Sequence, residues 1–273
     1  MGIQPSLWGR TFRTFFASPG LYLAVAIPLF ILMAVLLNVV VAVFIAPHSS
    51  AEGHPAAIWK AMSGASKAGF MFSFIFSIWV PTFLAACGIT FIAAGQYGNR
   101  VVTAGQTAAA IIRFVPAALI FSLVPGMLIS MASTFLILPG FLVAAAFSLL
   151  IAAKTVEGKG PFASIGRSLS LASSGGAFLR ALGLLLTCSV LVVAGEIAGY
   201  IIAPFLPMVP RPVTIMACLA IPWTQAIIIL NINLTLLYFD ATNKSVPAAV
   251  AAVAFSSSTP PPPKPQLPSP PQG

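Results

Sequence analysis

Long hydrophobic runs alternate with short polar segments along this chain. The runs cover approximately residues 21–45, 68–94, 114–153, 181–203 and 213–239. A helix needs about 20 apolar residues to cross a hydrocarbon core of about 30 Å, and the runs lack the polar alternation of a membrane β-strand. Because lipid offers the backbone no hydrogen-bond partners, the pattern predicts membrane-spanning α-helices.

The run between Arg113 and Lys154 is long enough for two spans. It holds 40 uncharged residues, which would make a helix of about 60 Å at about 1.5 Å per residue. We expect it to fold back at Pro139-Gly140, near its middle, because proline lacks the amide that continues a helix. Pro125-Gly126 leaves too short a segment before it for a span, so a kink is expected there. The sequence therefore predicts an all-α bundle of about six transmembrane helices.

The two ends of the chain differ from this pattern. Residues 5–17 place Trp8 and three phenylalanines at helical spacing, with Arg10 and Arg13 largely on the other side, which is typical of an interfacial helix. Residues after Lys244 include a run of four prolines, a composition that favours an extended, disordered segment. We therefore divide the chain into an interfacial helix on the cytoplasmic side, a six-span membrane domain and a disordered proline-rich cytoplasmic tail, at residues 1–20, 21–243 and 244–273.

Two of the polar loops predict further surface helices, at residues 103–113 and 161–172. Thr103 and Gln106 have the spacing of a capping box. In the second helix an apolar face of Phe162, Ile165 and Leu169 lies opposite Ser164, Arg167 and Ser168. The two loops together suggest a weak internal repeat of span, surface helix and span, although similarity by chance among small apolar residues is the alternative.

Composition and charge support a membrane protein and give it an orientation. Hydrophobic residues make up 59% of the chain and charged residues 6%, whereas soluble proteins carry about a quarter charged residues. The net charge of +9 borders the apolar runs, so we expect no nucleic-acid partner. Positive residues favour the cytoplasmic side, which places both termini in the cytoplasm and the spans in the cell (plasma or inner) membrane. The ten Lys and Arg residues on this side are Arg10, Arg13, Arg100, Arg113, Lys154, Lys159, Arg167, Arg180, Lys244 and Lys264.

Groups that could carry catalysis are scarce. The chain has four acidic residues and two histidines, so we expect no enzyme, cofactor or metal site. Glu52 and the two histidines share one loop, and the expected role of these residues is solvation rather than metal binding. Glu196 lies inside the fifth span, where a carboxylate is costly and often functional. With Asn231 and Thr235 of the sixth span it forms a candidate intramembrane polar site, for which hydrogen bonding between helices is the plainer alternative.

Short motifs resemble a known membrane domain. These are Glu157-Gly158, Pro161-Phe162 and Arg167-Ser168-Leu169, followed two spans later by Leu237-Tyr238-Phe239-Asp240. Over about residues 5–245 the chain resembles the membrane domain of bacterial glycerophosphoryl diester phosphodiesterases and its stand-alone relatives. The resemblance implies a six-span bundle, and we find no segment similar to the catalytic barrel. We expect Glu157, Arg167 and Asp240 to form an ion-pair cluster at the cytoplasmic face.

Two classes of function follow from these features. We expect a non-catalytic scaffold or accessory protein that contacts anionic lipids and protein partners at its cytoplasmic face. Arg10, Arg13 and Arg167 are the candidate contacts to lipid headgroups, and the proline-rich tail is the candidate site for a protein partner. The alternative is a small permease that uses the polar groups of spans five and six.

Overall fold

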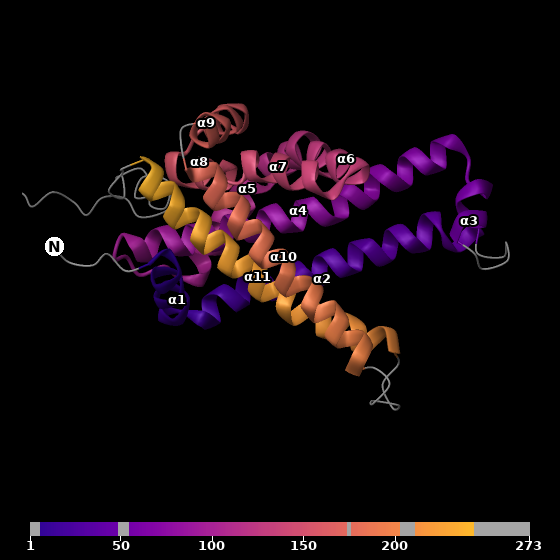
Figure 1. The fold of residues 1–273 in the computed structure, drawn as a ribbon, viewed down its shortest axis with the longest axis horizontal. Coiled ribbons are helices and arrows are strands. Elements are labelled where there is room, and N and C mark those ends of the chain that lie inside the picture. Colours follow the sequence, from indigo (N-terminus) through magenta and orange to yellow (C-terminus); the bar gives the residue numbers. More distant parts are fainter. Residues whose placement is uncertain (1–5, 49–54, 174–175, 203–210, 243–273) are drawn as a thin grey trace, which may run out of the picture.

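The structure, a computed structural model, describes residues 6–48, 55–173, 176–202 and 211–242 (Figure 1). Side chains are not described at residues 48, 55–56, 135, 196, 199–200, 202 and 211–221. Within the described ranges the regular structure is helical throughout. The proline-rich tail, predicted to be disordered, lies outside the described residues.

Six helices are long and apolar enough to cross a membrane, as the hydrophobic pattern predicts. The third is built from α5, a π-helical segment η2 and α6, and the fourth from α7 and α8. The chain is therefore a multi-pass α-helical membrane protein. In chain order its elements are α1 (Leu7–Ala17), α2 (Pro19–Phe44), η1 (Ala46–His48), α3 (Pro55–Ala61), α4 (Gly64–Tyr97), α5 (Ala104–Phe121), η2 (Ser122–Gly126), α6 (Met127–Phe135), α7 (Ile137–Phe147), α8 (Leu150–Glu157), α9 (Pro161–Ser173), α10 (Ala177–Ile202) and α11 (Arg211–Thr242).

Helices α4 and α11 form the centre of the bundle. In each, 72% of the most hydrophobic stretch is buried, against 11% in α2. The α2 and α4 pair runs to the tip at α3, while α10 and α11 diverge from it (Figure 1). Helix α11 meets α2 where the rings of Phe30 and Trp223 lie 5.2 Å apart. The exposed valine, leucine and isoleucine side chains of α2 suit contact with lipid, which is as apolar as they are.

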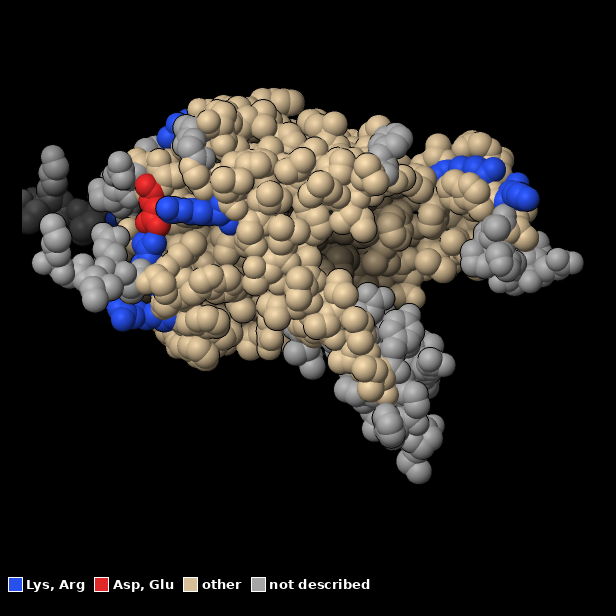
Figure 2. Space-filling view, viewed as in Figure 1, with Lys and Arg blue, Asp and Glu red and all other residues tan. Residues whose placement is uncertain are grey.

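Charge gathers at the two ends of the bundle. Lys and Arg side chains, with the acidic ones among them, lie at the end that holds α1, α8, α9 and the last turns of α11, which we call the charged end (Figure 2). A smaller basic group lies at the α3 tip, and the surface between is uncharged in this view. At the tip, Lys67 lies 5.7 Å from the centre of the Trp59 ring. This arrangement fits a bilayer with aqueous phases at both ends.

The turn between spans three and four differs from the prediction. The chain turns at Leu136, whose backbone is extended (φ −158°, ψ 142°), and Pro139 and Gly140 lie in the first turn of α7. Proline is tolerated there because the first amides of a helix need no intrahelical acceptor. A Cβ added to Gly140 would lie 2.9 Å from the Cα of Ser133, so this glycine lets α6 and α7 approach closely.

At Pro125-Gly126, where a kink is expected, the helix contains the π-helical segment η2. Proline has no amide to donate to the carbonyl four residues earlier, and a wider helical turn accommodates that loss. On the facing side, Gly126 packs against Trp79, whose indole nitrogen donates to the Ser130 hydroxyl at 2.9 Å.

Two surface segments also differ from the sequence prediction. The helix predicted at residues 103–113 is not separate, because α5 begins at Ala104 and continues into span three. Its predicted capping box is confirmed. The Thr103 hydroxyl accepts from the Gln106 backbone amide, and the Gln106 side-chain oxygen accepts from the Thr103 backbone amide. The segment read as a polar loop after span one contains η1 and α3, and α4 already begins at Gly64.

Candidate functional site

The Leu-Tyr-Phe-Asp motif forms the centre of the charged end. It lies in the last two turns of α11, where Leu237, Tyr238 and Phe239 are buried. The Phe239 ring stacks on Tyr97 at the end of α4, with centroids 4.7 Å apart and an interplanar angle of 7°. Because successive helical residues point about 100° apart, the four residues of the motif face different neighbouring elements.

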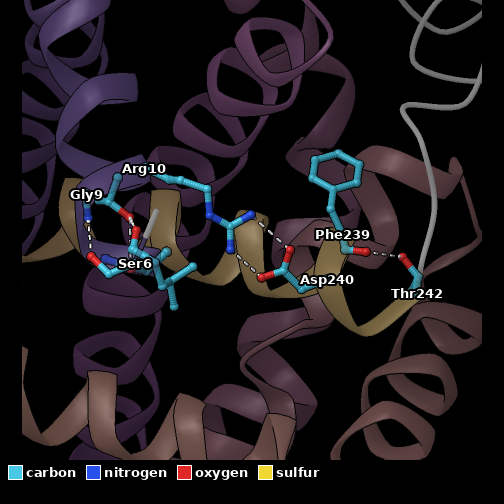
Figure 3. Close-up of polar contacts among 9 residues, drawn as sticks. Ser6, Gly9, Arg10, Phe239, Asp240 and Thr242 are labelled. Atoms are coloured by element: carbon cyan, nitrogen blue, oxygen red, sulfur yellow. Dashed lines mark hydrogen bonds and ion pairs between the residues drawn. The ribbon is translucent and has the colours of Figure 1, made fainter. Parts of the chain in front are cut away.

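Asp240 binds the N-terminal helix through a two-pronged ion pair (Figure 3). The two terminal nitrogens of Arg10 lie 3.0 and 2.5 Å from the two carboxylate oxygens of Asp240. This hydrogen bond to Asp240, more than the opposite charge, raises the pKa of Arg10, while desolvation opposes the rise. Ser6 begins α1 by accepting a hydrogen bond from the Gly9 amide at 3.2 Å, as a helix N-cap does. The two parallel charge-assisted bonds between Arg10 and Asp240 fix the relative orientation of these side chains as well as their distance.

Glu157 forms a second ionic group at the end of α8. Its carboxylate is only 6% exposed and lies 2.7 Å from the Lys159 ammonium and 3.5 Å from the Arg167 side chain. Gly158 makes the turn possible, because it ends α8 in the left-handed conformation with φ 65°. The buried hydroxyl of Tyr238 lies beside Glu157 and Arg167. Two cations therefore neutralise one buried carboxylate where α8, α9 and α11 meet.

The predicted cluster of Glu157, Arg167 and Asp240 is divided between these two groups. Glu157 and Arg167 come together, whereas Asp240 takes Arg10 as its partner. Arg10 and Arg167 were also candidates for headgroup contact, and both are engaged inside the protein. Of the three candidates, Arg13 is the exposed one.

The predicted intramembrane polar residues of span six point into the bundle. The Asn231 amide donates to the Ile227 carbonyl at 2.8 Å. The Thr235 hydroxyl lies 2.6 Å from the Asn231 carbonyl and 3.3 Å from the Thr90 hydroxyl on α4. Glu196 belongs to α10, but its side chain lies outside the described part of the structure. Of the described members of this site, Thr235 therefore bonds α11 to α4, whereas Asn231 bonds within α11.

Two buried polar contacts were not found from the sequence. The Thr11 hydroxyl on α1 contacts the Asn233 side-chain oxygen at 2.9 Å, and the Tyr22 hydroxyl contacts the Gln96 side-chain oxygen at 2.9 Å. Both pairs lie at the charged end and join segments more than 70 residues apart. The one available signal was the position of a threonine between the two arginines of an amphipathic helix.

Neither a group of metal-binding side chains among the described residues nor a similar known protein identifies a function for this site. Among the described residues, no three His, Cys, Asp or Glu side chains gather where they could hold a metal ion. Glu52 and His54 lie outside those residues. No protein-family model, curated protein or solved structure matches the chain. The resemblance to the phosphodiesterase-associated membrane domain therefore stays a prediction.

Proposed function

We propose that the chain is a non-catalytic scaffold or accessory protein of the cell membrane, which presents its charged end to lipids and protein partners in the cytoplasm. The observation that carries this proposal is that the polar side chains at that end form contacts between helices. Both ionic groups and the buried Thr11 contact join one helix to another. Such contacts supply a fixed platform, and they leave no described carboxylate free to act as a general acid or base.

The same contacts weigh against the permease alternative. A permease needs polar groups that converge on a path for solute near the middle of the membrane. Asn231 and Thr235, the described residues of the candidate polar site, are buried and bonded to neighbouring backbone and to Thr90. Hydrogen bonding between helices is the ordinary use of such residues in a bundle.

Purification from native membranes in a mild detergent tests the scaffold proposal. Proteins and lipids that remain bound are identified by mass spectrometry, with an unrelated six-span protein purified in parallel as the control. We expect specific protein partners and bound lipid, and a chain shortened after Thr242 shows whether the tail contributes to partner binding. Recovery of no partner above the control would contradict the proposal.

Labelling of a cysteine at position 231 distinguishes the scaffold proposal from the permease alternative. After replacement of the native cysteines, Asn231→Cys should resist a small water-soluble thiol reagent in sealed vesicles, because that site faces the bundle. Rapid labelling that a transported solute blocks would favour transport and overturn the scaffold proposal.

A further inference from the structure

Helix α1 buries polar side chains and exposes part of its aromatic side, while Phe15 packs inward on Tyr22. Thr11 is fully buried and Arg10 is paired with Asp240. In contrast, the side chains of Phe12 and Phe16 are 44% and 69% exposed. Their rings continue a ridge that starts at Trp8, with successive centroids 6.2 and 6.5 Å apart. Trp8 itself is half-buried against the core, so we call Phe12 and Phe16 the aromatic ridge.

Helix α9 also buries hydroxyl side chains and exposes large apolar ones. Ser164 and Ser168 are buried, and the Ser168 hydroxyl donates to the Ala146 carbonyl of α7 at 2.9 Å. Phe162 is 70% exposed, and Leu169, about two turns later, is 42% exposed. In a water-soluble protein the apolar face of a surface helix packs on the core and the polar face meets solvent. Both helices depart from this arrangement by burying hydroxyl side chains and exposing large apolar ones, although each also packs apolar side chains on the core, which are Phe15 of α1 and Ile165 and Leu171 of α9.

The connections of the two helices fix where these outward faces lie. Ser18 alone separates α1 from α2, the first span. Helix α9 follows the end of span four after residues 158–160, and span five begins at Ala177. Neither helix can therefore move far from the membrane surface. A helix held there with aromatic side chains outward meets the boundary between headgroups and acyl chains.

We infer that α1 and α9 insert the aromatic ridge, Phe162 and Leu169 among the acyl chains of the leaflet at the charged end, whatever the charge of the lipid headgroups. This inference rests on the proposed function and names the lipid chemistry behind it. Apolar insertion provides the contact with lipid, because Arg10 and Arg167 form ion pairs within the protein. The exposed Arg13 remains to contact headgroups at the rim.

Spin labels on the full-length chain test this inference. Native cysteines are replaced, and single labels are placed by Phe16→Cys, Phe162→Cys and, as the control, Gly160→Cys in the exposed turn before α9. The protein is reconstituted in nanodiscs of phosphatidylcholine alone or with added phosphatidylglycerol. Collisions with oxygen report acyl surroundings, and collisions with a water-soluble nickel chelate report water.

We expect labels at 16 and 162 to collide with oxygen and to be shielded from nickel in both membranes, at a depth of about 5–10 Å. The control label at 160 should collide with nickel. Nickel access at 16 and 162, or shielding only in the anionic membrane, would overturn the inference. Line broadening that dilution with unlabelled protein removes would show a second copy on this face and would overturn it as well.

A pair of variants keeps lipid insertion separate from partner binding. Phe12→Gln with Phe16→Gln should lose bound phosphatidylcholine in native mass spectrometry, whereas Arg13→Gln should keep it. The opposite result would refute insertion. Protein partners are measured in the same preparations, so loss of all partners with normal insertion would contradict the proposed function alone. Elution as a single species on size exclusion shows that each variant is folded.

Discussion

Removal of the Arg10 and Asp240 ion pair measures how firmly α1 is held to α11. The pair makes two parallel contacts, and its side chains are 25% and 32% exposed. Solvent-exposed pairs contribute about 0–1 kcal/mol, whereas removal of one partner from a fully buried pair costs about 3–5 kcal/mol. This pair lies between the two limits, and its geometry is favourable. We therefore expect a coupling of about 1–2 kcal/mol between the two side chains.

A double-mutant cycle isolates that coupling. The parent, Arg10→Gln, Asp240→Asn and the double variant are unfolded by denaturing detergent, and their free energies of unfolding are compared. Each single change should destabilise the protein, and the double change should cost about 1–2 kcal/mol less than the sum of the two. Arg13→Gln serves as the control. Arg13 is exposed and lies three residues after Arg10, so its replacement should change the free energy of unfolding little. Additivity within about 0.5 kcal/mol would refute the view that this pair holds α1 in place.

The pH dependence of this coupling follows from the sign of the Arg10 shift. The folded-state pKa of Arg10 is raised, chiefly by its hydrogen bond to Asp240. A group with a raised pKa contributes its full stabilisation below its ordinary pKa and loses it only as pH rises through the folded value. Arginine stays protonated throughout the neutral range. The contribution of Arg10 should therefore be constant there and fade only under strongly alkaline conditions, which pH-dependent unfolding measures.

Three further changes test the packing and the orientation. Gly140→Ala should destabilise the protein by about 1–3 kcal/mol, because the new Cβ meets the Ser133 backbone, and thermal unfolding measures it; an unchanged midpoint would contradict that close approach. Gly158→Ala should cost about 1 kcal/mol in the same assay, since an L residue is strained at φ 65°. Single cysteines at Lys60 and Gly160 should label from opposite sides of the membrane, with position 60 reached from outside. Labelling of both from one side would exclude the proposed topology.

Span number followed from the sequence because hydrophobic length alone decides it. The 40 uncharged residues after Arg113 could not form one span, so a hairpin was required. The site of its turn was wrong by three residues. A proline after a long apolar run marks either a turn or the first turn of the next helix. In both places the backbone amide that proline lacks is not needed for a helical hydrogen bond. Only the close packing of Gly140 on Ser133 decides between them.

The charged end was less predictable for a related reason. Glu157 and Arg167 are ten residues apart across one turn, so their proximity follows from local structure. Arg10 and Asp240 are 230 residues apart, and tertiary packing alone brings them together. Helical periodicity in α9 placed Phe162, Ile165 and Leu169 on one face, but Ile165 packs on the core while Phe162 and Leu169 are exposed. Periodicity does not state which face is inward.

The end of α11 explains why these separate contacts belong to one arrangement. Four successive residues of a helix cover about 300° around its axis, so a short motif on a central helix can touch every element around it. Phe239 holds α4, Asp240 holds α1 and Tyr238 lies beside the groups of α8 and α9. Helix α1 is therefore tied to the last turns of α11 by the Arg10 and Asp240 ion pair, whereas the ion pair of α9 joins it to Glu157 of α8. We therefore expect a shift of α1 within the leaflet to break this ion pair or to move the end of α11, which couples lipid contact by α1 to the packing of the central helix.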